Sequence, residues 1–306
     1  MPHSKPLMPS ELQIFSSLNA RMNLTSNDKR IFHNLQKGYE GELKFSRLLE
    51  KGITGDCIQL YDLLLESNQT EFQIDNLLIY QDTIFMNEVK YHEGDFLVSG
   101  DKWYMISSEK EIRNPIFQLQ RSEFLLRQLL QQIGFHFNVE AKLVFVHPEF
   151  TLYQAPYDQP IVFPTQLNRY IKQLNYTPSR LTDKQHNLAK QLIHRHITTS
   201  RHERLPDYHY DDLKKGILCK ACGGFMIPIR SAKLYCEICR QEEPTNLAVM
   251  RAVAEFYQLF PNKRINISII HDWCKIIKSK ERIRKILLDN MQLIRNGRYS
   301  YYIFNK

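Results

Sequence analysis

The sequence predicts an α/β protein in which a mixed sheet is flanked by helices, followed by a zinc ribbon and a small winged-helix-like module. Three observations support this prediction. Helix-like and strand-like segments follow one another in the order α-β-β-β-α-β over residues 27–178. Two C-x-x-C pairs come next, and three amphipathic helical segments and a hairpin end the chain. A hydrophobic content of 43% with 11% aromatic residues is ample for packed cores in 306 residues.

The chain is therefore expected to contain several parts. Three prolines among the first nine residues predict a mobile start. The expected parts are a mobile N-terminus (1–26), an α/β domain (27–178), a helical linker (179–216), a zinc ribbon (217–242) and a basic module (243–306). No run of 18 apolar residues indicates a membrane span, and the N-terminus lacks a signal-peptide pattern. A cytoplasmic protein is the expectation.

Charge is distributed unevenly along the chain. Residues 1–179 carry 17 Lys and Arg against 21 Asp and Glu, a net −4, whereas residues 180–306 carry 24 against 12, a net +12. Such an asymmetry is typical of a nucleic-acid contact surface appended to a domain that bears carboxylates. A solvated basic face without a partner is the alternative interpretation.

Charged groups interrupt a predicted apolar hairpin at residues 71–91. Because strand side chains alternate between faces, Glu88 and Lys90 share one face of the second strand. Antiparallel pairing brings Asp75 of the first strand near Glu88. Two carboxylates and an ammonium group are costly to bury for structure alone, so they indicate a site. The alternative is an exposed hairpin with a cross-strand salt bridge.

Metal-assisted phosphodiester hydrolysis uses these residue types. Mg²⁺ is usually held by one or two carboxylates, with water and phosphate completing its shell. A bound metal ion lowers the pKa of water and neutralises charge on phosphate. A nearby ammonium group orients that water or stabilises the developing charge.

Two predicted helices carry further polar residues. In a helix that begins near Ser26 and ends near Lys51, Glu42 lies against an apolar stripe. Gly38 and Gly41 each cost this helix about 1 kcal/mol, which suits close approach to a strand or a phosphate. Gln118 lies one turn inside a second helix, which is capped by Asn114 and begins at Pro115. Exposure on a helix surface is the alternative for both Glu42 and Gln118.

Four motifs occur in a characteristic order: G-Y-E-G-E at 38–42, Q-I-D at 73–75, N-E-V-K at 87–90 and N-P-I-F-Q at 114–118. Roughly residues 30 to 150 resemble the NERD, or nuclease-related, domain, which is similar to the PD-(D/E)xK nuclease superfamily. The resemblance implies that the mixed sheet is nuclease-like. Ile74 takes the place of the proline in the superfamily name.

The resemblance also implies a role for each matching residue. Asp75 and Glu88 are the implied ligands of Mg²⁺ or Mn²⁺, and Lys90 is the implied catalytic lysine. Glu42 is the implied acid on the helix, and Gln118 is a polar residue that points at the site. Membership implies nuclease chemistry, although domains of this superfamily have also been retained as binding modules.

The second strong motif is a set of four cysteines: Cys219, Cys222, Cys236 and Cys239. Two C-x-x-C pairs at this separation predict one structural zinc ion held by four thiolates, with no open position for catalysis. The stretches 225–229 and 233–235 are expected to be the short strands of the ribbon. Disulfides are the alternative, which a cytosolic location disfavours.

The C-terminal part predicts a winged helix. Helices are expected at 245–259, 268–277 and 279–289, followed by a hairpin at 293–304 with Asn296–Gly297 at its tip. In that architecture a helix enters the major groove and a basic wing meets phosphate. An unspecific bundle with a solvated basic face is the alternative. The predicted nucleic-acid-binding residues are Lys278, Lys280, Arg282, Arg284, Lys285, Arg295 and Arg298.

These observations predict a Mg²⁺- or Mn²⁺-dependent nuclease that acts on nucleic acid, with DNA as the expected substrate, in DNA processing, repair or defence. A non-catalytic nucleic-acid-binding protein with the same fold is the first alternative. A zinc-stabilised protein-interaction adaptor is the second, and it leaves the carboxylates and the lysine without a role. The sequence identifies no protein partner.

Overall fold

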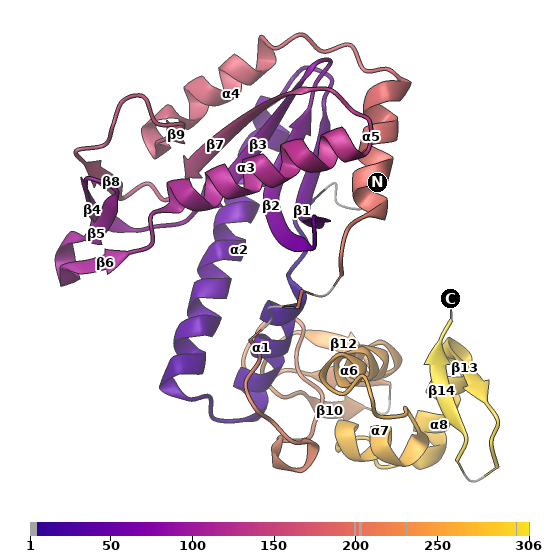
Figure 1. Cartoon of the computed structure of the whole chain (residues 1–306). Coiled ribbons are helices and arrows are strands. Elements are labelled where there is room, and N and C mark those ends of the chain that lie inside the picture. The colour runs from indigo at the N-terminus through magenta and orange to yellow at the C-terminus, as the bar shows by residue number, and fades with distance from the viewer. Residues whose placement is uncertain (1–4, 199, 202–203, 231, 298, 306) are drawn as a thin grey trace. The chain divides into compact units, whose positions relative to one another are not determined.

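The computed structural model describes residues 5–198, 200–201, 204–230, 232–297 and 299–305 (Figure 1). The chain forms two compact units. The first comprises residues 1–9 and 33–203, and the second comprises residues 10–32 and 204–306. Helix α2 (Ser26–Gly52) contributes its first residues to the second unit and the remainder to the first.

A five-stranded mixed sheet forms the centre of the first unit, as the sequence predicts. Strands β1, β2 and β3 pair antiparallel, whereas β7 is parallel to β3, and β9 is parallel to β7. The order is β1-β2-β3-β7-β9. The strands are β1 (Ile58–Ser67), β2 (Thr70–Ile79), β3 (Thr83–Lys90), β7 (Asn138–Phe145) and β9 (Ile161–Val162).

Helices cover both faces of this sheet. One core contains Phe45 and Leu49 of α2 together with Tyr170 of α4, packed on one face. The other core contains Leu126 of α3 and Leu188 of α5, packed on the opposite face. The remaining helices of this unit are α3 (Pro115–Gln132), α4 (Leu167–Asn175) and α5 (Asp183–His194), with a 3₁₀ turn at Pro164–Gln166.

Helix α5 lies within the range that the sequence assigns to a linker, residues 179–216. Its apolar residues Leu188, Ala189 and Leu192 are fully buried, in the same core as strand β1. Hydrogen bonds from Ile197 N–H to Leu64 O (2.8 Å) and from Leu64 N–H to His196 Nδ1 (3.2 Å) also attach the residues after α5 to that strand. This segment is therefore part of the first unit.

A second, four-stranded sheet extends the first unit. Its hairpin, β4–β5, turns at Gly100–Asp101, where Gly100 has a φ of +60° that favours glycine. The edge strands β6 and β8 were not predicted from the sequence. The order is β6-β5-β4-β8, with β4 (Gly94–Ser99), β5 (Lys102–Met105), β6 (Lys110–Ile112) and β8 (Phe150–Tyr153), and a 3₁₀ turn at Ile106–Ser108.

The second unit begins with helix α1 (Ser10–Arg21), where the prolines of the N-terminus predict a mobile segment. Phe15 and Leu18 are fully buried, and so is Arg21. The Arg21 guanidinium donates to Glu255 Oε2 at 2.7 Å and lies 3.9 Å from the centre of the Trp273 ring. These partners come from more than 200 residues later, so no local pattern in the sequence indicates them.

The cysteine-containing segment of this unit forms a three-stranded sheet in the order β10-β11-β12. The predicted stretches 225–229 and 233–235 correspond to its first two strands, and the third was not predicted. The strands are β10 (Ile227–Arg230), β11 (Lys233–Tyr235) and β12 (Glu242–Pro244), and a 3₁₀ turn at Tyr210–Asp212 precedes them.

The C-terminal module has the predicted order of three helices and a hairpin. Tyr302 N–H donates to Ile265 O at 2.8 Å, so β14 has a partner on each side, as in a winged-helix-like sheet. The loop between the hairpin strands is longer than the predicted two-residue tip and includes Gly297 at a φ of +53°. The elements are α6 (Thr245–Leu259), α7 (Ile267–Cys274), α8 (Lys280–Asn290), β13 (Met291–Ile294) and β14 (Tyr301–Phe304).

Within the described ranges, every helix is too short or too polar to cross a bilayer.

Candidate active site

The candidate site lies where the β2–β3 ladder ends. The last paired residues are Asn76 and Asn87. Just beyond this pair lie Asp75, which precedes Asn76 on β2, and Glu88, which follows Asn87 on β3. Beyond this pair a side chain connects the two strands in place of a main-chain hydrogen bond, because Asp75 Oδ2 accepts from Val89 N–H at 2.7 Å. The expected approach of Asp75 to the Glu88 segment is therefore observed.

A buried amide network holds the two strands together beside these acids. Asn87 Nδ2 donates to Asn76 Oδ1 at 2.8 Å, and the Tyr170 hydroxyl of α4 donates to Asn87 Oδ1 at 2.6 Å. Asn76 and Asn87 are 1% and 0% exposed, so breaking these bonds would leave buried amides unsatisfied. The network fixes the register that sets Asp75 beside β3.

Glu88, Lys90 and Gln118 form a connected group. Lys90 Nζ donates to Glu88 Oε1 at 2.6 Å and to Gln118 Oε1 at 3.2 Å. Glu88 is 3% exposed, whereas Lys90 and Gln118 are half-buried. Helix α3 positions Gln118: the Asn114 side chain accepts from Ile116 N–H at 3.0 Å and begins the helix one turn earlier.

Glu42 of α2 completes the acidic side of the site. Its Oε2 atom is buried without a hydrogen-bond partner. Burial, followed by repulsion from Asp75, Asp62 and Glu88, raises the pKa of Glu42 to about 9. Asp75 responds in the same way, since burial and then the Glu88 charge raise its pKa to about 8.

Lys90 stays charged in these surroundings. Burial acts to lower the pKa of Lys90, but attraction to Glu88 and Asp75 outweighs burial and raises it. One ammonium group therefore faces several carboxyl groups, two of which are pushed towards their protonated forms. The site has more acidic groups than its lysine neutralises.

Gly41 explains how Glu42 approaches the sheet. A Cβ atom added to Gly41 would lie 2.9 Å from Tyr91 Cβ, just beyond β3, so only glycine permits this distance between helix and strand. A Cβ atom on Gly38 would meet nothing within 4 Å. The expected close approach is therefore found at Gly41 and not at Gly38.

Asp62 is an acidic residue that sequence reasoning did not select. It lies in β1 opposite Asp75, but the ladder pairs on either side, Tyr61 with Asn76 and Leu63 with Ile74, skip this position. Asp62 has a φ of +50°, and its Oδ1 accepts from Gln73 Nε2 at 2.9 Å. Its signal in the sequence was an acidic residue with apolar neighbours on both sides, Tyr61 and Leu63.

The backbone irregularity at Asp62 interrupts the alternation of side chains along β1. Leu60 and Leu63 contribute to the same core although they are three residues apart, and so do Ile74 and Leu77 of β2. In regular strands an odd separation places side chains on opposite faces. Alternation is therefore broken in both strands at the acids, as is common beside functional sites.

The carboxyl groups suit a divalent cation. A cation with hard oxygen ligands would neutralise the charge that now raises the pKa values of Glu42 and Asp75, and would give the unpartnered Glu42 oxygen a nearby positive charge. One or two carboxylates are the protein ligands that Mg²⁺ usually has.

The four cysteines converge in the second unit, and all of their sulfur atoms lie within 4.8 Å of one another. After each C-x-x-C pair the next residue has a positive φ, +72° at Gly223 and +61° at Arg240, and its N–H donates to the carbonyl of the first cysteine. Four thiols in two matching turns are compatible with a structural zinc ion.

The predicted basic residues are mostly exposed. Lys278 precedes α8, and Lys280, Arg284 and Lys285 lie exposed on it, whereas Arg282 is half-buried. Arg284 forms an exposed ion pair with Glu281 at 3.5 Å. Arg295 is exposed in the loop after β13, and Arg298 lies outside the described residues. Among the described residues, the ion pair with Glu281 is the only polar side-chain contact found for the predicted basic residues.

Comparison with protein-family models matches residues 37–146 to the nuclease-related domain. The comparison with curated proteins yields no match, and neither does the comparison with solved structures. The matched range includes Glu42, Asp75, Glu88, Lys90 and Gln118. Residues 37–146 are therefore similar to the nuclease-related (NERD) domain, as the four sequence motifs indicate.

Proposed function

We propose that this protein is a metal-dependent nuclease that hydrolyses phosphodiester bonds in nucleic acid, with DNA as its substrate. The observation that carries the proposal is the group formed by Asp75, Glu88 and Lys90 at the end of the β2–β3 ladder. A role in DNA processing, repair or defence and a cytoplasmic location follow as expectations from this chemistry and from the sequence.

Each side chain has a proposed role. Asp75 and Glu88 hold Mg²⁺ or Mn²⁺, which supplies an activated water and neutralises phosphate charge. The ammonium group of Lys90 stabilises negative charge that develops on the phosphate. Gln118 orients Lys90 through its 3.2 Å hydrogen bond, and Glu42 supplies a further carboxyl group beside the ligands.

The second unit is the proposed nucleic-acid-binding part. It carries 22 Lys and Arg against 12 Asp and Glu, whereas the first unit carries 19 against 21. We assign DNA contacts to the basic residues of α8 and to Arg295, and one structural zinc ion per chain to the four cysteines.

The test uses the full chain with labelled single- and double-stranded DNA and RNA, in Mg²⁺ or Mn²⁺. Lys90→Ala should retain metal binding and cut about 10²–10³-fold more slowly. Asp75→Asn and Glu88→Gln should lose metal binding and cutting together. Glu40→Gln is the matched control, since Glu40 is exposed on the same helix as Glu42. Titration of Mn²⁺ by calorimetry separates binding from turnover.

The non-catalytic alternative makes a different prediction for the same variants. If this fold binds nucleic acid without cleaving it, Lys90→Ala should weaken nucleic-acid binding. Neither wild type nor any variant should then show cleavage. Wild-type protein that binds Mn²⁺ at this site yet cleaves none of the four nucleic acids would decide for that alternative.

A further inference from the structure

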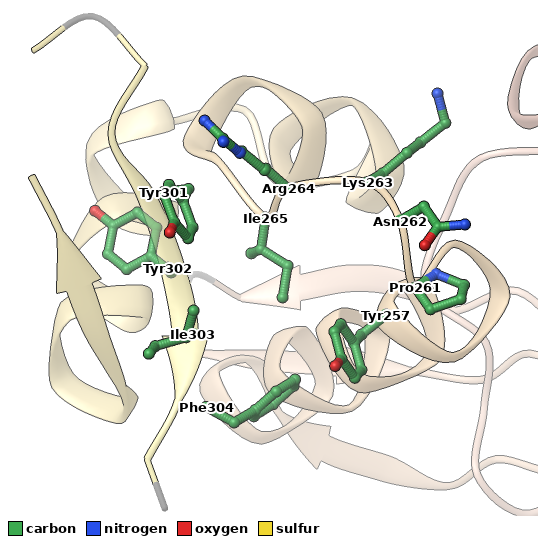
Figure 2. A pocket seen from close by; sticks show the side chains of 10 residues that line it. All are labelled: Tyr257, Pro261, Asn262, Lys263, Arg264, Ile265, Tyr301, Tyr302, Ile303 and Phe304. Atoms are coloured by element: carbon green, nitrogen blue, oxygen red, sulfur yellow. The ribbon is translucent and has the colours of Figure 1, made fainter. Parts of the chain in front are cut away.

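A groove of about 320 Å³ lies in the C-terminal module (Figure 2). One wall is the loop 261–265 after α6, the other is strand β14, and Tyr257 of α6 closes one end. This volume is at the lower end of the roughly 300–1,000 Å³ that is typical of small-ligand sites. It is separate from the basic residues of α8.

The groove combines aromatic rings with cations and contains no acid among its lining residues. Tyr257 is 48% exposed and Phe304 is 36% exposed, and their rings meet edge to face at 5.5 Å between centres. Lys263 and Arg264 are exposed, and Figure 2 shows both side chains extending from the loop away from this ring pair. The Arg264 guanidinium lies 4.8 Å from the centre of the Tyr301 ring.

The walls are joined before any ligand binds. The 2.8 Å hydrogen bond from Tyr302 N–H to Ile265 O connects β14 to the loop. Ile265 and Tyr302 are 3% and 4% exposed, so this connection is packed within the module. A preformed groove loses little conformational entropy when it binds a ligand.

We propose that this groove binds single-stranded nucleic acid, with an unpaired base stacked on Tyr257 and Phe304 and its neighbouring phosphates at Lys263 and Arg264. The positive charge and the absence of carboxylates among the lining residues match a polyanion. Exposed aromatic rings match the faces of bases, which a duplex hides within its stack. The inference rests on the proposed function in one respect, that the substrate is a nucleic acid.

The experiment measures binding of the full-length protein to labelled oligonucleotides in EDTA, where no cleavage takes place. Tyr257→Ala should weaken binding of single-stranded DNA by about tenfold, because the variant loses the stacking of one base. It should leave the dependence of affinity on salt unchanged. Arg264→Ala should lower that salt slope by about 0.7, the value for one phosphate contact on a single strand.

An abasic oligonucleotide, which keeps the phosphates but lacks bases, tests stacking directly. Wild-type protein should bind it about as weakly as Tyr257→Ala binds normal single-stranded DNA, and Tyr257→Ala should cause no further loss. Tyr176→Ala and Lys172→Ala are controls, since both residues are exposed in the first unit. Circular dichroism should show that each variant is folded.

Two outcomes would overturn the inference. If Tyr257→Ala and Phe304→Leu both bind single strands as wild type does, the groove has no part in binding. If both variants lose duplex and single-strand affinity equally, the groove contacts duplex DNA instead. Neither outcome depends on cleavage, and absence of cleavage in the earlier test would leave these binding results unchanged.

Discussion

At the scale of single residues, Gln118 is proposed to orient Lys90 and not to act on the substrate itself. It contacts Lys90 Nζ at 3.2 Å, so we expect Gln118→Leu to leave Lys90 less firmly oriented. Cleavage should fall about tenfold with Mn²⁺ affinity unchanged, whereas Gln120→Leu, an exposed position on the same helix, should have no effect. Gln118→Glu should retain the contact and restore part of the rate. Equal losses at positions 118 and 120 would contradict this role.

The raised pKa values of Glu42 and Asp75 predict how stability depends on pH. Both lie above the ordinary values of 4.5 and 3.8, so the folded state holds more protons than the unfolded state between about pH 4 and pH 9. Stabilisation is therefore complete at the acidic end of this window and is lost as pH rises through 8 to 9. The slope should reach up to about 1.4 kcal/mol per pH unit for each carboxyl group.

Thermal unfolding of the metal-free protein between pH 5 and pH 9 measures this effect. Glu42→Gln, which is neutral at every pH, should flatten the decline, and Mg²⁺ or Mn²⁺ should oppose it by favouring the ionised forms. Glu40→Gln should follow wild type, because Glu40 is exposed. A Glu42→Gln protein with the wild-type pH profile would refute the assignment of a raised pKa to Glu42.

At the scale of elements, the two glycines of α2 should respond in opposite ways to alanine. Gly41→Ala places a methyl group 2.9 Å from Tyr91 Cβ and should destabilise the protein by about 1–3 kcal/mol, because helix and strand must separate. Gly38→Ala meets open space and should stabilise the helix by about 0.5–1 kcal/mol. Denaturant unfolding gives both values. Cleavage should fall only for Gly41→Ala, since Glu42 is the next residue.

The cysteine-containing sheet is expected to depend on its metal. Purified protein should contain one zinc ion per chain by elemental analysis. Cys222→Ser should release this ion and speed amide hydrogen exchange in residues 217–242, because a three-ligand site binds zinc more weakly. Cys57→Ser, outside the cluster, should keep the zinc. Freshly reduced wild-type protein without stoichiometric zinc would disprove the site.

At the scale of the whole molecule, charge is separated between the two units. Alanine at Lys278, Lys280, Arg284 and Lys285 should lower the slope of log affinity against log salt for duplex DNA, by up to about 0.9 for each phosphate that the variant no longer neutralises. The control removes four exposed lysines of the first unit, Lys51, Lys110, Lys172 and Lys190. The same slope in wild type and in the first variant would give α8 another role.

Much of the fold was predictable because its signals are local. The alternation of β3 placed Glu88 and Lys90 on one face, and the 2.6 Å distance between Lys90 Nζ and Glu88 Oε1 agrees with it. Helix α6 occupies the predicted range, and the paired cysteines converge as their spacing indicates. Turn residues, caps and periodicity act over a few residues, and a single sequence displays them completely.

Contacts between residues that are distant in sequence decided the parts of the fold that local signals do not predict. Helix α1 forms on partners such as Glu255 and Trp273, so the prediction of a mobile segment there was wrong. The helix expected within the linker range is α5, and a strand more than 100 residues earlier holds it in the first unit. Asp62 joins the site only because β1 and β2 both break alternation there. The sequence by itself indicated Glu42, Asp75, Glu88, Lys90 and Gln118 as candidate site residues. The tertiary structure decided their pKa values, because burial and mutual repulsion exist only when α2 and the sheet are packed together.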